Sequence, residues 1–141
     1  MQINSDLLAD FAQRYTAAWS SGNPESVAAF FSVNGSLTIN SGTPAIGRSE
    51  IMAVADSFMT TFPDLTVAMD DLRIEVGGAK YNWTLTGTHT GPGGTGRKIH
   101  ISGFERWRIG EDGLIASSEG WFDAAEYQRQ MTKEPARGTE E

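Results

Sequence analysis

The sequence of 141 residues contains no cysteine. A disulfide framework, a zinc–thiolate site, an iron–sulfur cluster and a thiol nucleophile are therefore excluded. Long apolar runs are missing too, because no segment approaches the ~18 consecutive apolar residues that a membrane span needs, and residues 1–11 do not have the pattern of a secretory signal. We expect a soluble, cytoplasmic protein with no membrane partner.

Positive charge is also scarce. Lys and Arg number 11 against 18 Asp and Glu, which gives a formal net charge of −7. Nucleic-acid binding needs a concentrated basic face, and here the basic residues are scattered, so we expect no nucleic-acid partner. His89 and His100 have no third ligand at an obvious spacing, which argues against a metal site. The glycine-rich segment 91–98 joins two expected strands and does not lead into a helix, so no nucleotide or other cofactor is expected.

The apolar content is sufficient for one packed domain. Hydrophobic residues make up 39% of the sequence and aromatic residues 10%, which allows a core and the walls of a cavity. A chain of this length typically forms a single domain. We assign residues 1–131 to that domain and residues 132–141 to a disordered polar tail.

Three helices and one short strand are expected in the first half of the chain. Apolar residues at steps of three and four predict a helix from Ser5 to about Ser20, capped by Asn4 or Ser5. Asn23 and Pro24 predict the start of a second, short helix. A strand over 36–40 ends in a turn, and a third helix is predicted over 48–61, before Pro63.

Four long antiparallel strands are expected in the second half, over residues 65–76, 81–86, 97–109 and 114–122. The apolar positions of the first strand change parity at Asp70–Asp71, which predicts a β-bulge and a bend. Asp123 and Glu126 have the spacing of a capping box for a last helix through Met131. This order predicts an α+β cone, in which the N-terminal helices cover one face of a curved antiparallel sheet.

Six short stretches resemble one known family: QRYTAAW (13–19), AAFF (28–31), GR (47–48), GTHTG (87–91), TGR (95–97) and GFERWR (103–108). Together they resemble the SnoaL-like branch of the NTF2-like superfamily, which contains polyketide cyclases and has ketosteroid isomerases as more distant relatives. The similarity covers about residues 5–131. It implies an NTF2-like cone with an interior pocket for a small, apolar molecule, but it does not determine the chemistry.

Glu105 is the first catalytic candidate. It shares strand parity with Ile99, Ile101 and Trp107, so it faces the interior if they do, and an apolar wall would then raise its pKa. Its position resembles that of the protonated oxyanion-hole aspartate of ketosteroid isomerases, and Tyr15 resembles the matching tyrosine. Both would then donate hydrogen bonds to an enolate oxygen. The alternatives are a Glu105 paired with an arginine at a sheet edge and a Tyr15 that only packs in the core.

Two positions depart from the pattern that the resemblance implies. The position of Asn40 resembles that of the general base in the isomerases. An amide cannot accept a proton from carbon at neutral pH, so we assign Asn40 to substrate orientation. Gly120 lies near the position of the cyclases' pocket aspartate. Asp123 would replace that aspartate only if it pointed inward, and a helix cap is the favoured interpretation.

His89 has the strand parity of Tyr81, Trp83 and Leu85. It is either a proton relay at the mouth of the pocket or a strand-end residue bonded to the glycine-rich loop, and the sequence leaves both open. His100 has the opposite parity and is expected to face solvent or a dimer partner. Large aromatics exceed the needs of a small core, so we assign four of them to the substrate-binding wall, with ordinary packing as the alternative: Trp19, Trp83, Trp121 and Phe58.

These features favour an acid/base enzyme that acts on an apolar carbonyl compound by enolisation, aldol cyclisation, isomerisation or hydration. Its predicted catalytic residues are Glu105, His89 and Tyr15. Asn40 and Gly120 favour a second hypothesis, a non-catalytic binding protein for an apolar ligand. A third is a dimeric association module, because the exposed sheet face of such folds often pairs about a two-fold axis, and we expect a homodimer.

Overall fold

The computed structural model describes residues 4–132. The elements in chain order are α1 (Ser5–Trp19), α2 (Pro24–Ala28), β1 (Phe31–Ile39), β2 (Ala45–Ile46), α3 (Arg48–Thr61), β3 (Thr66–Glu75), β4 (Gly78–Thr88), β5 (Lys98–Ile109), β6 (Ile115–Phe122) and α4 (Ala124–Thr132). The predicted order of helices and strands is confirmed, with the short strand β2 as an addition. Of the predicted tail, Thr132 belongs to α4, and 133–141 lie outside the described residues.

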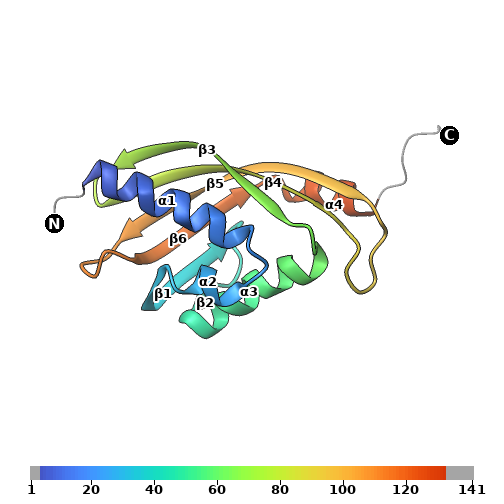
Figure 1. Ribbon diagram of the computed structural model, residues 1–141, viewed down its shortest axis with the longest axis horizontal. Helices are drawn as coiled ribbons and strands as arrows, with labels where there is room; N and C mark the ends of the chain where they lie inside the picture. Colours follow the sequence, from blue (N-terminus) through green and yellow to red (C-terminus); the bar gives the residue numbers. More distant parts are fainter. Residues whose placement is uncertain (1–3, 133–141) are drawn as a thin grey trace.

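The six strands form one curved, open sheet in the order β2-β1-β6-β5-β4-β3. All neighbouring pairs are antiparallel except β1 and β6, which run parallel. The predicted antiparallel run of four strands, β3 to β6, is confirmed. The parallel pairing of β1 with β6 is an addition to it, which the long crossover between the two strands permits. In Figure 1, α1 lies across the sheet, while α2 and α3 lie beside β1 and the short strand β2.

The predicted bulge in β3 is present. The pairing of β3 with β4 shifts register between Met69 and Asp71. Without this extra residue, the apolar side chains after it would turn to the outer face of the sheet, because strand side chains alternate. The bulge thus keeps Val67 buried before it and Leu72 packed against the core after it.

Side-chain caps fix the ends of three helices. The Oδ1 atom of Asn4 accepts hydrogen bonds from the backbone N–H groups of Asp6 and Leu7, at 2.9 and 3.1 Å. Asn23 caps α2 in the same way, just before Pro24. Asp123 accepts from the backbone N–H of Glu126 at 3.0 Å and so caps α4. Asp123 is thus a helix cap, as favoured from the sequence.

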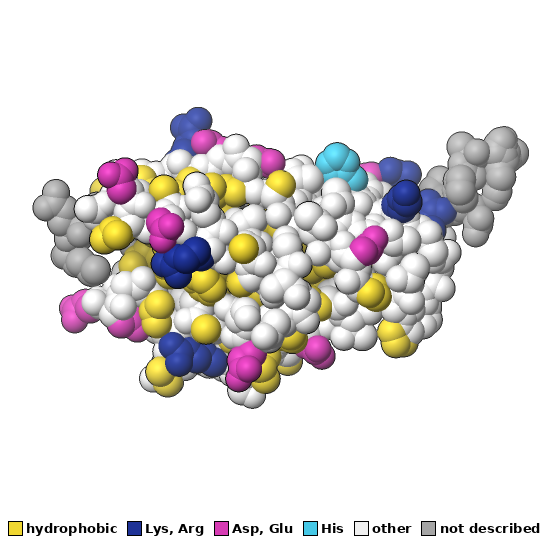
Figure 2. Space-filling view, viewed as in Figure 1, with side chains coloured by type: hydrophobic (Ala, Val, Ile, Leu, Met, Phe, Trp, Pro, Cys, Tyr) yellow, Lys and Arg dark blue, Asp and Glu magenta, His cyan; other side chains and the backbone are white. Residues whose placement is uncertain are grey.

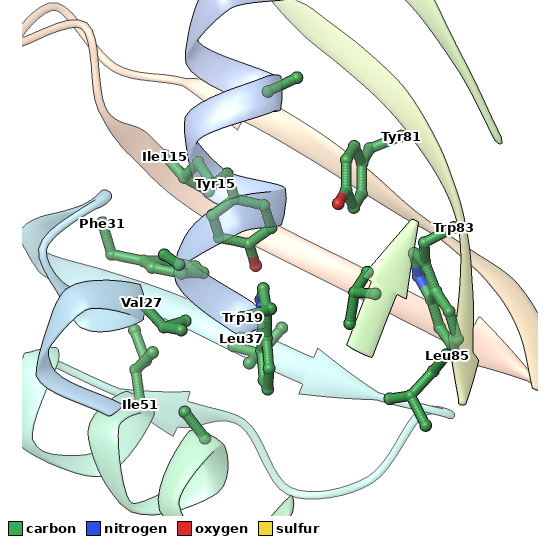
Figure 3. Packing of buried hydrophobic residues seen from close by; sticks show 14 of the residues in the cluster. Tyr15, Trp19, Val27, Phe31, Leu37, Ile51, Tyr81, Trp83, Leu85 and Ile115 are labelled. Atoms are coloured by element: carbon green, nitrogen blue, oxygen red, sulfur yellow. The ribbon is translucent and has the colours of Figure 1, made fainter. Parts of the chain in front are cut away.

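The core lies between α1 and the concave face of the sheet. Tyr15 is at its centre and packs edge-to-face against Trp19, Phe30, Tyr81 and Trp107. Figure 3 shows Tyr15 and Trp19 on the helix facing Tyr81 and Trp83 on the sheet. Lys and Arg side chains are dispersed among acidic ones on the face in Figure 2. None of the described helices has the length and apolar content that crossing a bilayer would require.

Candidate functional site

An apolar cavity lies against the concave face of the sheet, with walls from five strands and three helices. The space open to the centre of a water molecule is about 50 Å³. One water needs ~10–15 Å³ on this measure, so the cavity has room for a few waters or a small organic group. Its lining residues are Trp19, Leu37, Ile39, Phe58, Val67, Tyr81, Trp83, Leu85, Ile101, Glu105, Gly120, Phe122 and Tyr127.

Glu105 is the one carboxylate in that lining. It lies in the middle of β5, opposite Tyr81 of β4 and Gly120 of β6. Its exposed fraction is 7%. The predicted inward orientation is therefore what the structure has, and the alternative of an arginine-paired Glu105 at a sheet edge is not. Arg106, the next residue, instead pairs with Glu75 at 3.0 Å.

Three donors converge on a single oxygen of Glu105. The Tyr15 hydroxyl donates to Oε1 at 2.9 Å, the Trp107 indole N–H at 3.0 Å and the Ser118 hydroxyl at 2.8 Å. The donors come from α1, β5 and β6, so three separate elements hold the carboxyl in one orientation. None of these three residues lines the cavity, whereas Glu105 does. We therefore infer that Oε2, and not Oε1, is the oxygen on the cavity side. Oε2 has no hydrogen-bond partner within residues 4–132.

The surroundings of Glu105 act on its protonation in two directions. Burial raises the pKa of the carboxyl above its ordinary value of 4.5, while the hydrogen bonds from Trp107, Ser118 and Tyr15 oppose this rise. Burial disfavours the charged form of the carboxyl, and this effect on its pKa is the larger one. An oxygen that accepts from three donors has no lone pair left for its own proton, so the proton of a neutral Glu105 is on Oε2. The group therefore gains and loses its proton on the cavity side.

Tyr15 holds the carboxyl and not a ligand. It is fully buried, and burial followed by the neighbouring Glu105 carboxyl raises the pKa of its phenol well above 10.0. Its only proton points to Glu105 Oε1. The predicted contact between Tyr15 and a substrate oxygen is therefore corrected, because the carboxyl competes for the same donor. The Trp19 indole N–H lies near the Tyr15 oxygen and lowers its pKa, without meeting the geometry of a hydrogen bond.

Asn40 is a turn residue and not part of the cavity wall. Its backbone φ is 52°, in the left-handed region that asparagine tolerates better than most residues. Its Oδ1 accepts from the backbone N–H of Phe122 at 2.9 Å, and its own N–H donates to the carbonyl of Gly120 at 2.8 Å. The side chain thus joins the end of β1 to β6, which corrects the predicted role in orienting substrate.

His89 does not reach Glu105. It follows the last residue of β4, and its backbone forms hydrogen bonds with Arg97 and Gly96 on the far side of the glycine-rich loop. Its Nδ1 lies 3.3 Å from the Thr95 hydroxyl, and its ring packs on Phe62. The structure therefore has the strand-end arrangement and not the relay at the pocket. His100 lies on the outer face, beside Gln130 of α4.

Three of the four aromatic residues assigned to the binding wall line the cavity: Trp19, Trp83 and Phe58. Trp121 does not, and 38% of it is exposed. Its neighbours Gly120 and Phe122 both line the cavity, so strand alternation turns Trp121 to the outer face. The assignment of Trp121 to the wall is thus corrected.

Sequence reasoning missed several residues of the site. Phe122 and Tyr127 line the cavity, and their rings pack against each other with centroids 5.4 Å apart. Ser118, which is buried and bonded to Glu105, was also missed. Its position two residues from Gly120, on the same face of the strand, was the available signal. Within residues 4–132, no three His, Asp or Glu side chains are grouped as metal ligands would be.

A second hollow of about 520 Å³ opens on the surface between β4, β5 and α4. Exposed polar and charged residues form its rim, among them Asp64, Lys98 and Arg129. It is larger than the cavity at Glu105 but contains no buried ionisable group. Of the two, only the smaller cavity has a buried carboxyl on which several donors converge, so we take that cavity as the candidate site.

The curved sheet, the covering helices and the interior cavity define an α+β cone of the NTF2-like class. The model of the SnoaL-like polyketide cyclase family matches residues 9–131, and the chain belongs to this family. No curated protein matches the sequence significantly. Solved structures with the same fold include a putative SnoaL-like polyketide cyclase from Jannaschia sp. CCS1, at 14% identity and a TM-score of 0.79 over 90% of this chain and 92% of that one.

Two further structures have the same fold. TsrD from Streptomyces laurentii is 22% identical, with a TM-score of 0.79 over 92% of this chain and 98% of that one. A hypothetical protein with a ketosteroid isomerase-like fold from Catenulispora acidiphila DSM 44928, in complex with trimethylamine, is 15% identical, with a TM-score of 0.76 over 86% of this chain and 91% of that one. At these identities the likeness shows the fold and leaves the chemistry to the site.

Proposed function

We propose that this protein is a proton-transfer enzyme for a small, largely apolar carbonyl compound, with Glu105 as its acid/base group. The observation that carries the proposal is that Glu105 lines the cavity and that three donors bind its Oε1, which leaves Oε2 without a partner among the described residues. Family membership supports a small-molecule substrate. The nearly apolar lining supports an apolar one.

In this proposal, Glu105 begins as the carboxylate. Its Oε2 removes a proton from the carbon next to the substrate carbonyl, the C–H bonding pair moves into the carbonyl system to give an enolate, and a carboxyl O–H bond forms. The same proton then returns to a carbon of the enolate, which restores the carboxylate. Burial that raises the pKa of Glu105 makes the carboxylate a stronger base, and this favours proton removal.

A single carboxyl has to perform both proton transfers. Gly120 has no side chain, and neither Asn40 nor His89 lines the cavity. Among the described residues of the lining, the other ionisable groups are the phenols of Tyr81 and Tyr127, and burial raises the pKa of both. Reactions that return the proton to the substrate, such as enolisation and isomerisation, therefore fit this site better than reactions that need a separate acid and base.

Hydrogen exchange tests this proposal directly. Apolar ketones such as cyclohexanone are incubated with the protein in D₂O, and deuterium at their α-carbons is followed by NMR. We expect faster exchange than in buffer, with a rate that rises with pH through one ionisation and has no second limb. Glu105→Gln should abolish the acceleration, because an amide cannot take the proton. Equal rates for the wild-type protein and Glu105→Gln across a ketone panel would remove Glu105 from catalysis.

The second candidate is a non-catalytic binding protein that uses the same cavity. It is favoured by the missing carboxylate at Gly120 and by the structural role of Asn40. Native mass spectrometry of the purified protein would detect a retained ligand. If that ligand is incubated with the protein in D₂O and recovered without deuterium at its α-carbons, the result would support binding without catalysis. The homodimer also stays a prediction, which sedimentation of the wild-type protein tests.

A further inference from the structure

The indole N–H of Trp83 is a buried donor with no acceptor. Trp83 lines the cavity and is 9% exposed, and its Nε1 has no hydrogen-bond partner within the described part of the chain. A buried donor without a partner destabilises the folded protein, so such groups call for an explanation. In Figure 3 this nitrogen is on the side of the ring that faces the interior.

The ring of Trp83 is fixed in its orientation. Its Cζ2 and Cη2 atoms lie over Gly103 of the neighbouring strand, where a Cβ atom would come within 2.7 and 2.9 Å of them. Phe122 packs edge-to-face against the same ring, with centroids 6.1 Å apart. Because the indole lies over a glycine and packs against the Phe122 ring, these contacts restrict its rotation and preorganise its N–H as a donor.

The residue that carries this donor is a near neighbour of Glu105 on the same face of the sheet. Tyr81 is directly opposite Glu105, and Trp83 is two residues further along β4, so Trp83 and Glu105 are diagonal neighbours. Diagonal neighbours on adjacent strands are about 7–8 Å apart at Cα, within reach of one small molecule. The other unpaired indole in the lining, that of Trp19, is turned toward the Tyr15 hydroxyl in Figure 3. Trp83 is therefore the donor that a ligand can use.

We propose that Trp83 Nε1 donates a hydrogen bond to the carbonyl oxygen of the ligand and so places the carbon next to it at Glu105 Oε2. This role deepens the proposed function and rests on it, because Tyr15, whose proton goes to Glu105, cannot hold that oxygen. The ligand class that follows is an apolar carbonyl compound. A hydrocarbon of the same shape leaves the indole unpaired and binds less tightly.

Two probes of nearly equal shape test the hydrogen bond without any need for turnover. Cyclohexanone has an acceptor oxygen, and methylenecyclohexane has a CH₂ group in its place. The protein has 4 tryptophans and therefore four indole N–H signals in a ¹H–¹⁵N spectrum. We expect cyclohexanone to move the Trp83 signal downfield and methylenecyclohexane to leave it without a downfield shift. A Trp83 signal that does not respond to cyclohexanone overturns the proposal.

A variant separates this hydrogen bond from simple packing. Trp83→Phe keeps an aromatic ring and loses the N–H, so it should weaken cyclohexanone binding roughly threefold to tenfold more than methylenecyclohexane binding. Trp121→Phe, on the outer face, is the matched control and should change neither affinity. Equal losses for the two probes in Trp83→Phe would mean that Trp83 only fills space. That result overturns the role of Trp83 but leaves the proposed function standing. The proposed function is tested separately, by the hydrogen-exchange activity of Glu105→Gln.

Discussion

Gly103 is the residue at which the structure predicts the sharpest steric penalty near the site. It faces the interior from β5, and a Cβ atom there would collide with the backbone oxygen of Trp121 and approach two ring atoms of Trp83 to 2.7 and 2.9 Å. The collision with the backbone oxygen decides the penalty, because the backbone of β6 can move only if the paired strands separate. Overpacking of this kind costs about 1–3 kcal/mol. A backbone collision should be at the upper end, so we expect Gly103→Ala to lose about 2–3 kcal/mol of unfolding free energy.

The matched control is Gly120→Ala, on the next strand and the same face. A Cβ at Gly120 would lie 3.5 Å from Cγ of Glu105, which is ordinary van der Waals contact, and 3.8 Å from two backbone oxygens. Its stability should stay within about 0.5 kcal/mol of wild type, as for a substitution without a clash. The assay is urea unfolding followed by tryptophan fluorescence. A Gly103→Ala protein with the wild-type midpoint, or equal losses in both variants, would refute the packing described around Trp83.

Three further outcomes test the site and its supports. The native state binds the Glu105 proton more tightly than the unfolded chain, since the folded pKa is raised above 4.5. The free energy of unfolding in urea should therefore fall as pH rises from 4.5 through the folded pKa. The Glu105→Gln variant should lack this fall. Asn40→Ala should cost about 1 kcal/mol more than Asn40→Gly in the same assay, because only glycine adopts a φ of 52° freely. Ser118→Ala removes a donor that lowers the pKa of Glu105, so the pH profile of exchange should shift upward; an unshifted profile would contradict the hydrogen bond.

Local signals predicted most of the fold, because they depend on neighbours in sequence. The side chains of Asn23 and Asp123 accept hydrogen bonds from backbone N–H groups that follow within three residues. The bulge is visible in the sequence as a change of parity within a single strand. The inward orientation of Glu105 follows from alternation along β5 in the same way. These features need no knowledge of which strands pair, so the sequence was sufficient for them.

The errors occurred where the outcome depends on distant partners. Asn40 is an acceptor for Phe122, and this contact exists only because β1 pairs in parallel with β6. Trp121 was assigned inward because it is large and apolar, but the inward positions of β6 contain Ser118 and Gly120, whose size gives no hydrophobic signal. Tyr15 was placed on the correct face of its helix, yet the partner of its hydroxyl depends on the Glu105 side chain from β5.

The hydrogen-bond pattern at Glu105 also argues against a purely structural role for this carboxyl. Tyr15, Trp107 and Ser118 all donate to Oε1, and the amide oxygen of a glutamine would accept from the same three donors. Glutamine would do so without the cost of burying an ionisable group, which is the cause of the raised pKa. What glutamate adds is a proton that binds and leaves at Oε2. A Glu105→Gln protein that is as stable as the wild type and inactive in exchange is therefore the result that separates the two roles.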